Sequence, residues 1–264
     1  MIRPLVAAVL ASLAALPAAA APCGNTGAGF NAWKADFAAT AQQAGVRKKG
    51  LEALAQAQYA TRTIAADRGQ KSFKYTLDKF MKVRGADAIV SQGRKRLKSN
   101  PNFYRTLEAQ YGVPAGILLT LHGMETGFGN FMGDSQIVSA IVTLAYDCRR
   151  SEFFIPHAIG ALMLVDQGSI TTGTLGAKHG ELGHTQFLPG NALAYGVDAT
   201  GDGRVDFYNM TDALASTANF LRAKGWQPGK GYQQGQPNFK VIQAWNGATV
   251  YQQAIALMAA RIDG

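Results

Sequence analysis

Apolar residues recur at helical spacing from residue 30 onward, after the alanine-rich start of the chain. Phe30, Trp33 and Phe37 lie on one helical stripe, and Gly45 closes it. A second helix is predicted over residues 48–58. Two amphipathic helices are therefore expected near the start of the folded part of the chain.

The stretch 66–111 is basic and keeps the same helical spacing. Pro101 occupies a position that is typical of a first helical turn. The segments with this pattern are residues 73–83, 86–99 and 101–111. Together with the two preceding helices, they predict an all-helical N-terminal lobe over residues 22–111.

The rest of the chain differs in amino-acid composition. Residues 112–226 are richer in glycine and in isolated polar residues flanked by aromatics, which is typical of a domain that carries a site. Residues 227–264 are expected to form a connector, a short strand at 239–245 and a closing amphipathic helix at 248–262. Because strand patterns are few, the predicted fold is mainly α with few short strands.

The first 21 residues have the pattern of a secretory signal peptide. Arg3 precedes an uncharged apolar run that Pro17 interrupts, and alanines follow at the expected cleavage position. The run is shorter than the roughly 20 residues that span a membrane. We expect a periplasmic protein that is soluble after signal cleavage and has no transmembrane span.

Composition and charge limit the classes of molecule that the protein is expected to bind. The chain has 264 residues, 47% of them hydrophobic, which is enough for a sizeable core, and a formal net charge of +9. Such a charge attracts polyanions or simply favours solubility. Export separates the chain from nucleic acid, so the polyanions it would meet are the cell-wall polymer and anionic lipid.

Two cysteines, Cys23 and Cys148, stand far apart without metal-ligand spacing. In an oxidising compartment they are expected to form one disulfide, which would contribute about 4–5 kcal/mol in the chain-entropy model. The alternative is two unpaired, buried thiols.

The sequence HGMETGFGN places Glu125 at a predicted helix end. Leu118, Leu121 and Glu125 share one helical face, and Gly127 is a natural residue to end the helix. Burial and the negative end of the helix dipole both disfavour the ionised carboxylate, so the pKa of Glu125 should rise. A carboxyl that stays protonated near neutral pH suits a general acid for glycosidic-bond cleavage. The alternative is a glutamate that turns outward to solvent.

A second glycine-rich segment, GELGHTQFLPG, carries polar residues between its glycines. Closely spaced glycines let the backbone approach a ligand, and the amide of Gln186 can donate to and accept from sugar hydroxyls and amides. An ordinary loop between helices has the same pattern.

The ordered motifs GMETGFG (123–129), LAYD (144–147) and QFLP (186–189), followed by GDG (201–203) and LASTANF (214–220), resemble the B-type lytic murein transglycosylases. The resemblance covers most of the chain after residue 21. It implies a lysozyme-like catalytic domain over residues 112–226, with peptidoglycan glycan strands as partner and no required cofactor. The implied reaction cleaves the MurNAc-β-1,4-GlcNAc bond and leaves 1,6-anhydro ends.

By this resemblance Glu125 matches the single catalytic glutamate, which acts first as acid and then as base. Gln186 matches a substrate-positioning glutamine, and four further residues match positions near the sugars or peptide stems. These implied substrate-binding residues are Phe187, Tyr251, Arg149 and Arg150.

The sequence departs from the family pattern around the groove. Lys178 and His179 stand where an aromatic-alanine pair is common, and His184 replaces a glutamine or tyrosine. Phe220 stands where a tyrosine often does. A hydrolytic muramidase, or a non-catalytic peptidoglycan-binding protein on the same fold, therefore stays an alternative. The four histidines lack zinc-ligand spacing, and no nucleophile-elbow motif is present.

Residues 198–209 have the spacing of a calcium-binding loop. Asp198, Thr200, Asp202 and Asp206 stand at ligand positions, but the twelfth position is Asn209 rather than glutamate. The loop is expected to be either a weak structural calcium site or a turn held by side-chain to backbone hydrogen bonds.

Overall fold

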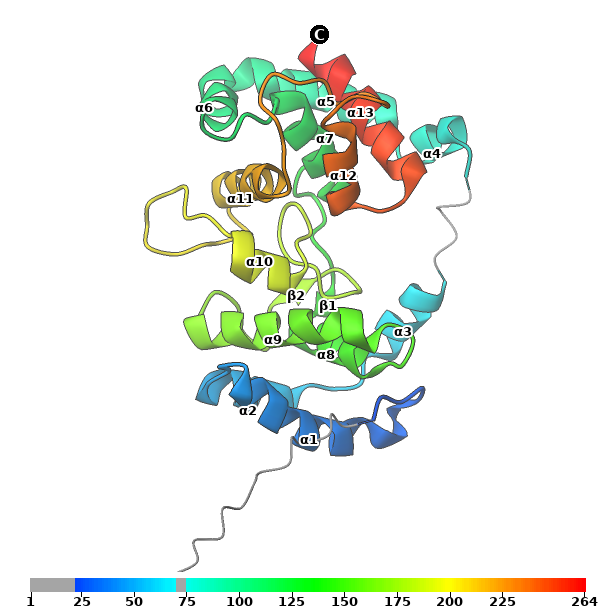
Figure 1. Cartoon of the computed structure of the whole chain (residues 1–264), viewed down its shortest axis with the longest axis vertical. Helices are drawn as coiled ribbons and strands as arrows, with labels where there is room; N and C mark the ends of the chain where they lie inside the picture. The colour runs from blue at the N-terminus through cyan, green and yellow to red at the C-terminus, as the bar shows by residue number, and fades with distance from the viewer. Residues whose placement is uncertain (1–21, 70–74) are drawn as a thin grey trace, which may run out of the picture.

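The computed structural model describes residues 22–69 and 75–264, and helices dominate them (Figure 1). The predicted signal peptide, residues 1–21, lies outside these residues, as do Phe73 and Lys74 of the predicted helix 73–83. The elements up to the middle of the chain are η1 Gly27–Gly29, α1 Phe30–Gln43, α2 Lys48–Gln56, α3 Thr61–Arg68, α4 Leu77–Val83, α5 Ala86–Ser99, α6 Pro101–Tyr111, α7 Ala115–Thr126 and β1 Ser135–Gln136. The later elements are α8 Ile137–Tyr146, α9 Ser151–Gln167, β2 Leu175–Gly176, α10 Pro189–Tyr195, α11 Met210–Ala223, α12 Phe239–Trp245 and α13 Thr249–Asp263.

The helices form two halves, one above the other in Figure 1. In the lower half, α8 packs against α9, α1 and α2 lie beneath them, and α3 packs on α8. In the upper half, α7 packs against α13, and α4, α5 and α12 surround this pair. Helices α10 and α11 lie between the halves, and α10 packs on α9.

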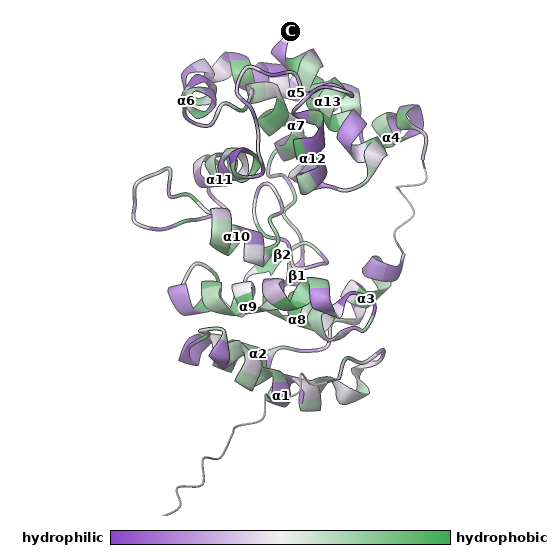
Figure 2. Cartoon of the chain, in the orientation of Figure 1, coloured by the Kyte–Doolittle hydropathy of each residue, from purple (hydrophilic) through white to green (hydrophobic). Residues whose placement is uncertain are grey.

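Each half is centred on a mainly apolar helix that is buried on nearly every face. Every residue of α8, IVSAIVTLAY, is buried, and so is every residue of α7 except Glu125. A helix that is hydrophobic on all faces must be covered on all faces, so it becomes the middle of a bundle. The more polar amphipathic helices, such as α2 and α5, cover these two and expose their charged sides (Figure 2).

Close helix packing in the upper half depends on Gly116. A Cβ at this position would lie 2.4 Å from the backbone oxygen of Ala259, so α7 and α13 approach closely only because no side chain stands there. The closing helix predicted at 248–262 is therefore part of the core, packed against the helix that carries Glu125.

Residues 22–111, predicted as one N-terminal lobe, are divided between the two halves. Helices α1, α2 and α3 belong to the lower half, whereas α4, α5 and α6 belong to the upper half. The physical reason is that each amphipathic helix buries its apolar face on the nearest central helix. Helical periodicity predicts that a face is buried, but not against which partner.

The predicted strand at 239–245 is wrong, because the structure forms α12 there. Val241 and Ile242 are buried, and Trp245, one helical turn further, is partly buried on the same side. A short apolar run cannot be assigned to helix or strand by periodicity alone. The strands that do form, β1 and β2, are two residues each and pair antiparallel.

A disulfide joins Cys23 to Cys148 and so ties the beginning of the described chain to the end of α8. Two backbone hydrogen bonds support the same junction: Gly24 N donates to Tyr146 O, and Cys148 N donates to Gly24 O. Within residues 22–69 and 75–264, no helix has both the length and the apolar character needed to cross a membrane.

Candidate active site

A cavity of about 290 Å³ is bordered by the ends of α7 and α12, by α10 and α11, and by the segment before α10. Its wall combines two carboxyl groups with amides and aromatic rings, a mixture suited to sugar hydroxyls and acetamido groups. The residues that line it are Glu125, Ala177, His179, Glu181, Gln186, Phe187, Leu188, Asn191, Phe220, Ala244, Trp245 and Asn246.

Glu125 reaches this cavity from the last turn of α7. Two neutral donors hold its Oε1 atom: the Tyr251 hydroxyl at 2.5 Å and the Trp245 indole Nε1 at 2.9 Å. Both donors come from the C-terminal helices α12 and α13. The carboxyl is thus fixed in place without an ion pair among the described residues.

The pKa of Glu125 is raised above its ordinary value. Burial is the largest cause, and the hydrogen bonds from Tyr251 and Trp245, together with the nearby Arg84 charge, oppose it in part. The Tyr251 hydroxyl in turn has a pKa well above 10, because of burial and the Glu125 charge, so it stays a donor. The group therefore combines a raised proton affinity with donors that stabilise its ionised form.

The turn after Glu125 is tied to the second glycine-rich segment. Gly127 and Phe128 adopt positive φ angles of 58° and 65°, which reverse the chain directly after α7. Thr126 Oγ1 donates to the His184 carbonyl at 2.7 Å and accepts from Gly129 N at 2.9 Å. The helix end that carries Glu125 and the loop that carries Gln186 are thereby held in one arrangement.

Gln186 lines the cavity in a strained backbone conformation, with φ +54°. Its Nε2 donates to Gly183 O at 2.8 Å and to Met132 O at 3.3 Å. Gly183 has φ +73°, and a Cβ there would lie 2.1 Å from Phe207 O, so this position requires glycine. The loop is packed tightly enough to hold Gln186 in one place.

The other predicted substrate-binding residues take different positions. Phe187 is 2% exposed and packs against Phe207, Phe220 and Trp245, so it mainly supports the cavity wall. Tyr251 is 3% exposed and binds Glu125 directly.

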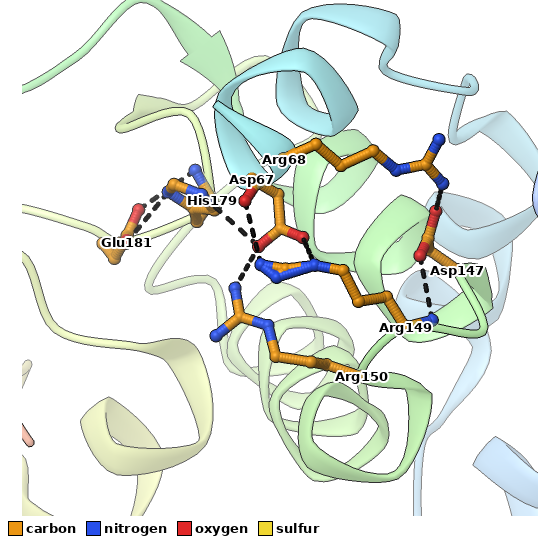
Figure 3. Close-up of polar contacts among 7 residues, drawn as sticks. All are labelled: Asp67, Arg68, Asp147, Arg149, Arg150, His179 and Glu181. Atoms are coloured by element: carbon orange, nitrogen blue, oxygen red, sulfur yellow. Dashed lines mark hydrogen bonds and ion pairs between the residues drawn. The ribbon is translucent and has the colours of Figure 1, made fainter. Parts of the chain in front are cut away.

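Arg149 and Arg150 lie beside the cavity in a charged cluster, drawn in Figure 3. Both bind the carboxylate of Asp67, which is only 3% exposed: Arg149 Nε lies 3.1 Å from it, and Arg150 donates to Oδ1. His179 Nε2 lies 3.7 Å from the same oxygen. A neighbouring pair, Arg68 and Asp147, meets at 2.5 Å. The two arginines are therefore engaged with Asp67 before any substrate binds.

The three basic departures from the family pattern, Lys178, His179 and His184, do not act together. His179 lines the cavity, and burial lowers its pKa below 6.5 despite the Asp67 charge, so it is largely neutral at pH 7. Lys178 is exposed. His184 instead pairs with the buried His122, with 2.9 Å between Nδ1 and Nε2, and its Nε2 lies 3.2 Å from Tyr208 O.

Sequence reasoning missed Glu181, Trp245, Asn191 and Asn246 as wall residues. Glu181 stood in the quoted glycine-rich segment, where its position between Gly180 and Leu182 gave a usable hint. Trp245 was missed because its contact with Glu125 joins residues 120 positions apart in sequence, which no local pattern reports.

The loop 198–209 is held by hydrogen bonds from its own backbone and side chains. Asp198 accepts bonds from the backbone of Gly201, Asp202 and Gly203 and from the Thr200 hydroxyl. Asp206 accepts from Tyr208 N, and Asn209, at the twelfth position, caps α11. Among the described residues, no three acidic, histidine or cysteine side chains converge as metal ligands.

Comparison with known proteins agrees with this geometry. A family model described as "Transglycosylase SLT domain" matches residues 29–236. The chain is 35% identical over 121 residues to membrane-bound lytic murein transglycosylase B of Escherichia coli K12, an alignment that covers 45% of this chain. It spans 34% of that relative's length.

Solved structures show the same fold. SltB3 of Pseudomonas aeruginosa, in complex with NAG-NAM-pentapeptide, superposes with a TM-score of 0.80 at 26% identity over 89% of this chain and 80% of that one. Escherichia coli Slt35, in complex with calcium, gives 0.74 at 22% identity over 87% and 92%. The predicted mainly α, lysozyme-like fold is confirmed.

Proposed function

Given that the chain belongs to the transglycosylase SLT domain family, we propose that it is a lytic transglycosylase of peptidoglycan. It cleaves the MurNAc-β-1,4-GlcNAc bond without water and leaves 1,6-anhydro-MurNAc ends. The observation that carries this proposal is Glu125, a carboxyl with raised pKa that faces a polar cavity and is held by Tyr251 and Trp245.

The first step uses the proton of Glu125. The raised pKa keeps the carboxyl protonated, and it donates this proton to the glycosidic oxygen as the bond to C1 breaks. The carboxylate that remains is stabilised by the Tyr251 and Trp245 donors, which stay in place throughout. No second protein carboxylate is needed, because the 2-acetamido group of the substrate stabilises C1.

In the second step Glu125 acts as the base. It accepts the proton of the C6 hydroxyl of the same muramic acid, whose oxygen bonds to C1 and closes the 1,6-anhydro ring. Burial, which disfavours the ionised carboxylate, favours this return of the proton. The carboxyl ends in the state in which it began.

Gln186 positions the sugar, in this proposal, because its amide lies in the cavity wall. Arg149 and Arg150 contribute through their charge near the peptide stems, since Asp67 already binds both guanidinium groups. The substrate class is the peptidoglycan glycan strand, and the protein works in the periplasm. The Cys23–Cys148 disulfide supports export to an oxidising compartment.

A hydrolytic muramidase is the second candidate, and Glu181 is the observation that favours it. Inverting glycosidases use two carboxyl groups on either side of the scissile bond, one of which activates water. The cavity holds two carboxyl groups, Glu125 and Glu181. The two candidates differ in product: hydrolysis leaves reducing ends.

The test is mass spectrometry of purified peptidoglycan digested by residues 22–264. Wild-type protein should release anhydro-ended muropeptides, and Glu125→Gln, which keeps a hydrogen-bonding side chain of the same size, should lower the rate by about 10²–10⁴-fold. Glu152→Gln, which removes a similar charge from the exposed first turn of α9, is the matched control and should act normally. Reducing ends would identify a hydrolase, and no product from any protein would leave a wall-binding protein.

A further inference from the structure

Glu181 is a cavity-wall carboxyl for which the proposed reaction has no use. It stands in the loop between β2 and α10, and its side chain is 23% exposed. Its Oε2 accepts the backbone N–H of His179 at 3.1 Å, and Oε1 lies 3.6 Å from His179 Nδ1. The carboxyl is thus anchored on one side and borders the cavity that Glu125 also borders.

The backbone around Glu181 is held closely. Ala177 N donates to Glu181 O at 2.9 Å, and a Cβ at Gly176 would lie 2.1 Å from that same oxygen. On the other side, Leu182 exchanges two backbone hydrogen bonds with Phe187. The loop therefore fixes Glu181 before substrate binds, a requirement for a residue that acts in a site.

The charged cluster of Figure 3 supports this wall from behind. His179, which holds the Glu181 carboxyl, reaches toward Asp67, and Asp67 is held by Arg149 and Arg150. Three elements far apart in sequence thus meet behind the loop: the end of α3, the start of α9 and the loop itself.

We propose that Glu181 is a second functional carboxyl of the cavity, which contacts the glycan beside the scissile bond and tunes the proton affinity of Glu125. This inference rests on the proposed function for its substrate. The ligand groups it would bind are the hydroxyl and acetamido N–H donors of the sugar. A carboxyl has free acceptor positions for them after it accepts the His179 N–H.

The two carboxyls are coupled through their charges. The pKa of Glu181 is raised to about 7, chiefly by burial and in part by the charge of Glu125, against the hydrogen bonds to the loop. Because such an interaction is reciprocal, an ionised Glu181 favours the protonated form of Glu125. The charge of one carboxyl therefore favours the protonated form of the other, in addition to the effect of burial on both.

Several other groups face this pair, and they set the background against which it titrates. His179 is held largely neutral by burial, and the Asp67 charge is compensated by two arginines. The groups that face the two carboxyls are His179 from the loop, Asp67 from α3, Arg149 and Arg150 before α9, Arg84 after α4, and Tyr251 from α13. Arg150 lowers the pKa of Glu181 and Arg84 lowers that of Glu125, so both charges oppose the mutual effect of the two carboxyls.

The first experiment measures this coupling without substrate. Protein with ¹³C-labelled glutamate side chains is titrated by NMR, and Glu181→Gln identifies the Glu181 resonance by its loss. We expect Glu181 to titrate near pH 7 in the wild type and at a clearly lower pH in Glu125→Gln. An unchanged titration of Glu181 in Glu125→Gln would overturn the coupling.

The second experiment measures the pH profile of kcat/KM on glycan strands. In Glu181→Gln the alkaline limb, which reports loss of the acid form of Glu125, should move about one pH unit lower, a usual size for a perturbation in a protein. Glu152→Gln should keep the wild-type profile. A uniform loss of activity with an unmoved limb would mean a structural role only.

Glu181→Ala tests the substrate contact. It should raise KM by about tenfold, the cost of one lost hydrogen bond, and Glu181→Gln should largely restore it, because the amide still donates and accepts. A KM equal to that of the wild type in Glu181→Ala would remove the contact from the proposal. If the wild type gives no product, the proposed function fails while the NMR titration still decides the coupling.

Discussion

The two carboxyls of the cavity are held by different halves of the molecule and by different forces. Glu125 belongs to the upper half, where the neutral donors Tyr251 and Trp245 bind it. Glu181 is held by a backbone N–H and, through His179, by the ionic cluster that the lower half builds around Asp67. Neutral donors hold Glu125 in place and still allow it to lose and regain a proton. The charged cluster behind Glu181 instead sets the local electrostatic potential that Glu181 experiences.

The two halves are also stabilised by different interactions. The upper half relies on the close packing of α7 and α13 across Gly116. The lower half adds a disulfide and the buried Asp67 cluster to the packing of α8 and α9. The upper half has the exposed Arg261–Asp87 ion pair, whereas the lower half has a covalent link and a buried ionic cluster, so changes in each should have separable effects.

The largest effect should come from removing the disulfide. It closes a loop of 125 residues, and the chain-entropy model assigns such a loop about 5 kcal/mol. Cys23→Ser with Cys148→Ser should lower the urea midpoint accordingly, with the greatest loss of hydrogen-exchange protection in α1 and α8. A midpoint equal to that of the oxidised wild type would show that the lower half does not depend on this link.

Asp67→Asn should come next, with a loss of about 3 kcal/mol, since breaking a buried ion pair leaves uncompensated charge. The pKa of His179 should fall further, because the Asp67 charge raises it. Asp134→Asn is the matched control: its ion pair with Arg62 is exposed to solvent, so its loss should leave the stability nearly unchanged. If thermal unfolding showed equal losses of stability in the two variants, the Asp67 cluster would be no more important for stability than the exposed ion pair.

Tyr251→Phe should have a smaller effect, about a tenfold loss in kcat, as one hydrogen bond to the carboxylate is removed. Since this bond lowers the pKa of Glu125, its loss should raise that pKa and move the alkaline limb of the pH profile upward. Glu181→Gln should move the same limb downward. If the alkaline limb of the pH profile moved in the same direction in both variants, the opposite roles assigned to Tyr251 and Glu181 would be contradicted.

Much of the fold could be predicted because periodicity reports burial directly. The α1 stripe, the basic helices before residue 111 and the end of α7 at Gly127 all follow from spacing and capping residues. The helix at 239–245 was missed because seven apolar and polar residues fit either period. The division of residues 22–111 between the two halves was not predicted, because periodicity does not choose a packing partner.

By itself, the sequence determined the main helices and the position of Glu125 at a helix end, since both depend on neighbours within a few residues. The family motifs also lie in short local segments. Tertiary structure alone decided which groups meet Glu125 and Glu181: Tyr251 stands 126 residues from Glu125, and Asp67 reaches the loop only through α3. The physical reason is that proton affinity depends on burial and on charges a few ångströms away, and the packing of distant helices creates both.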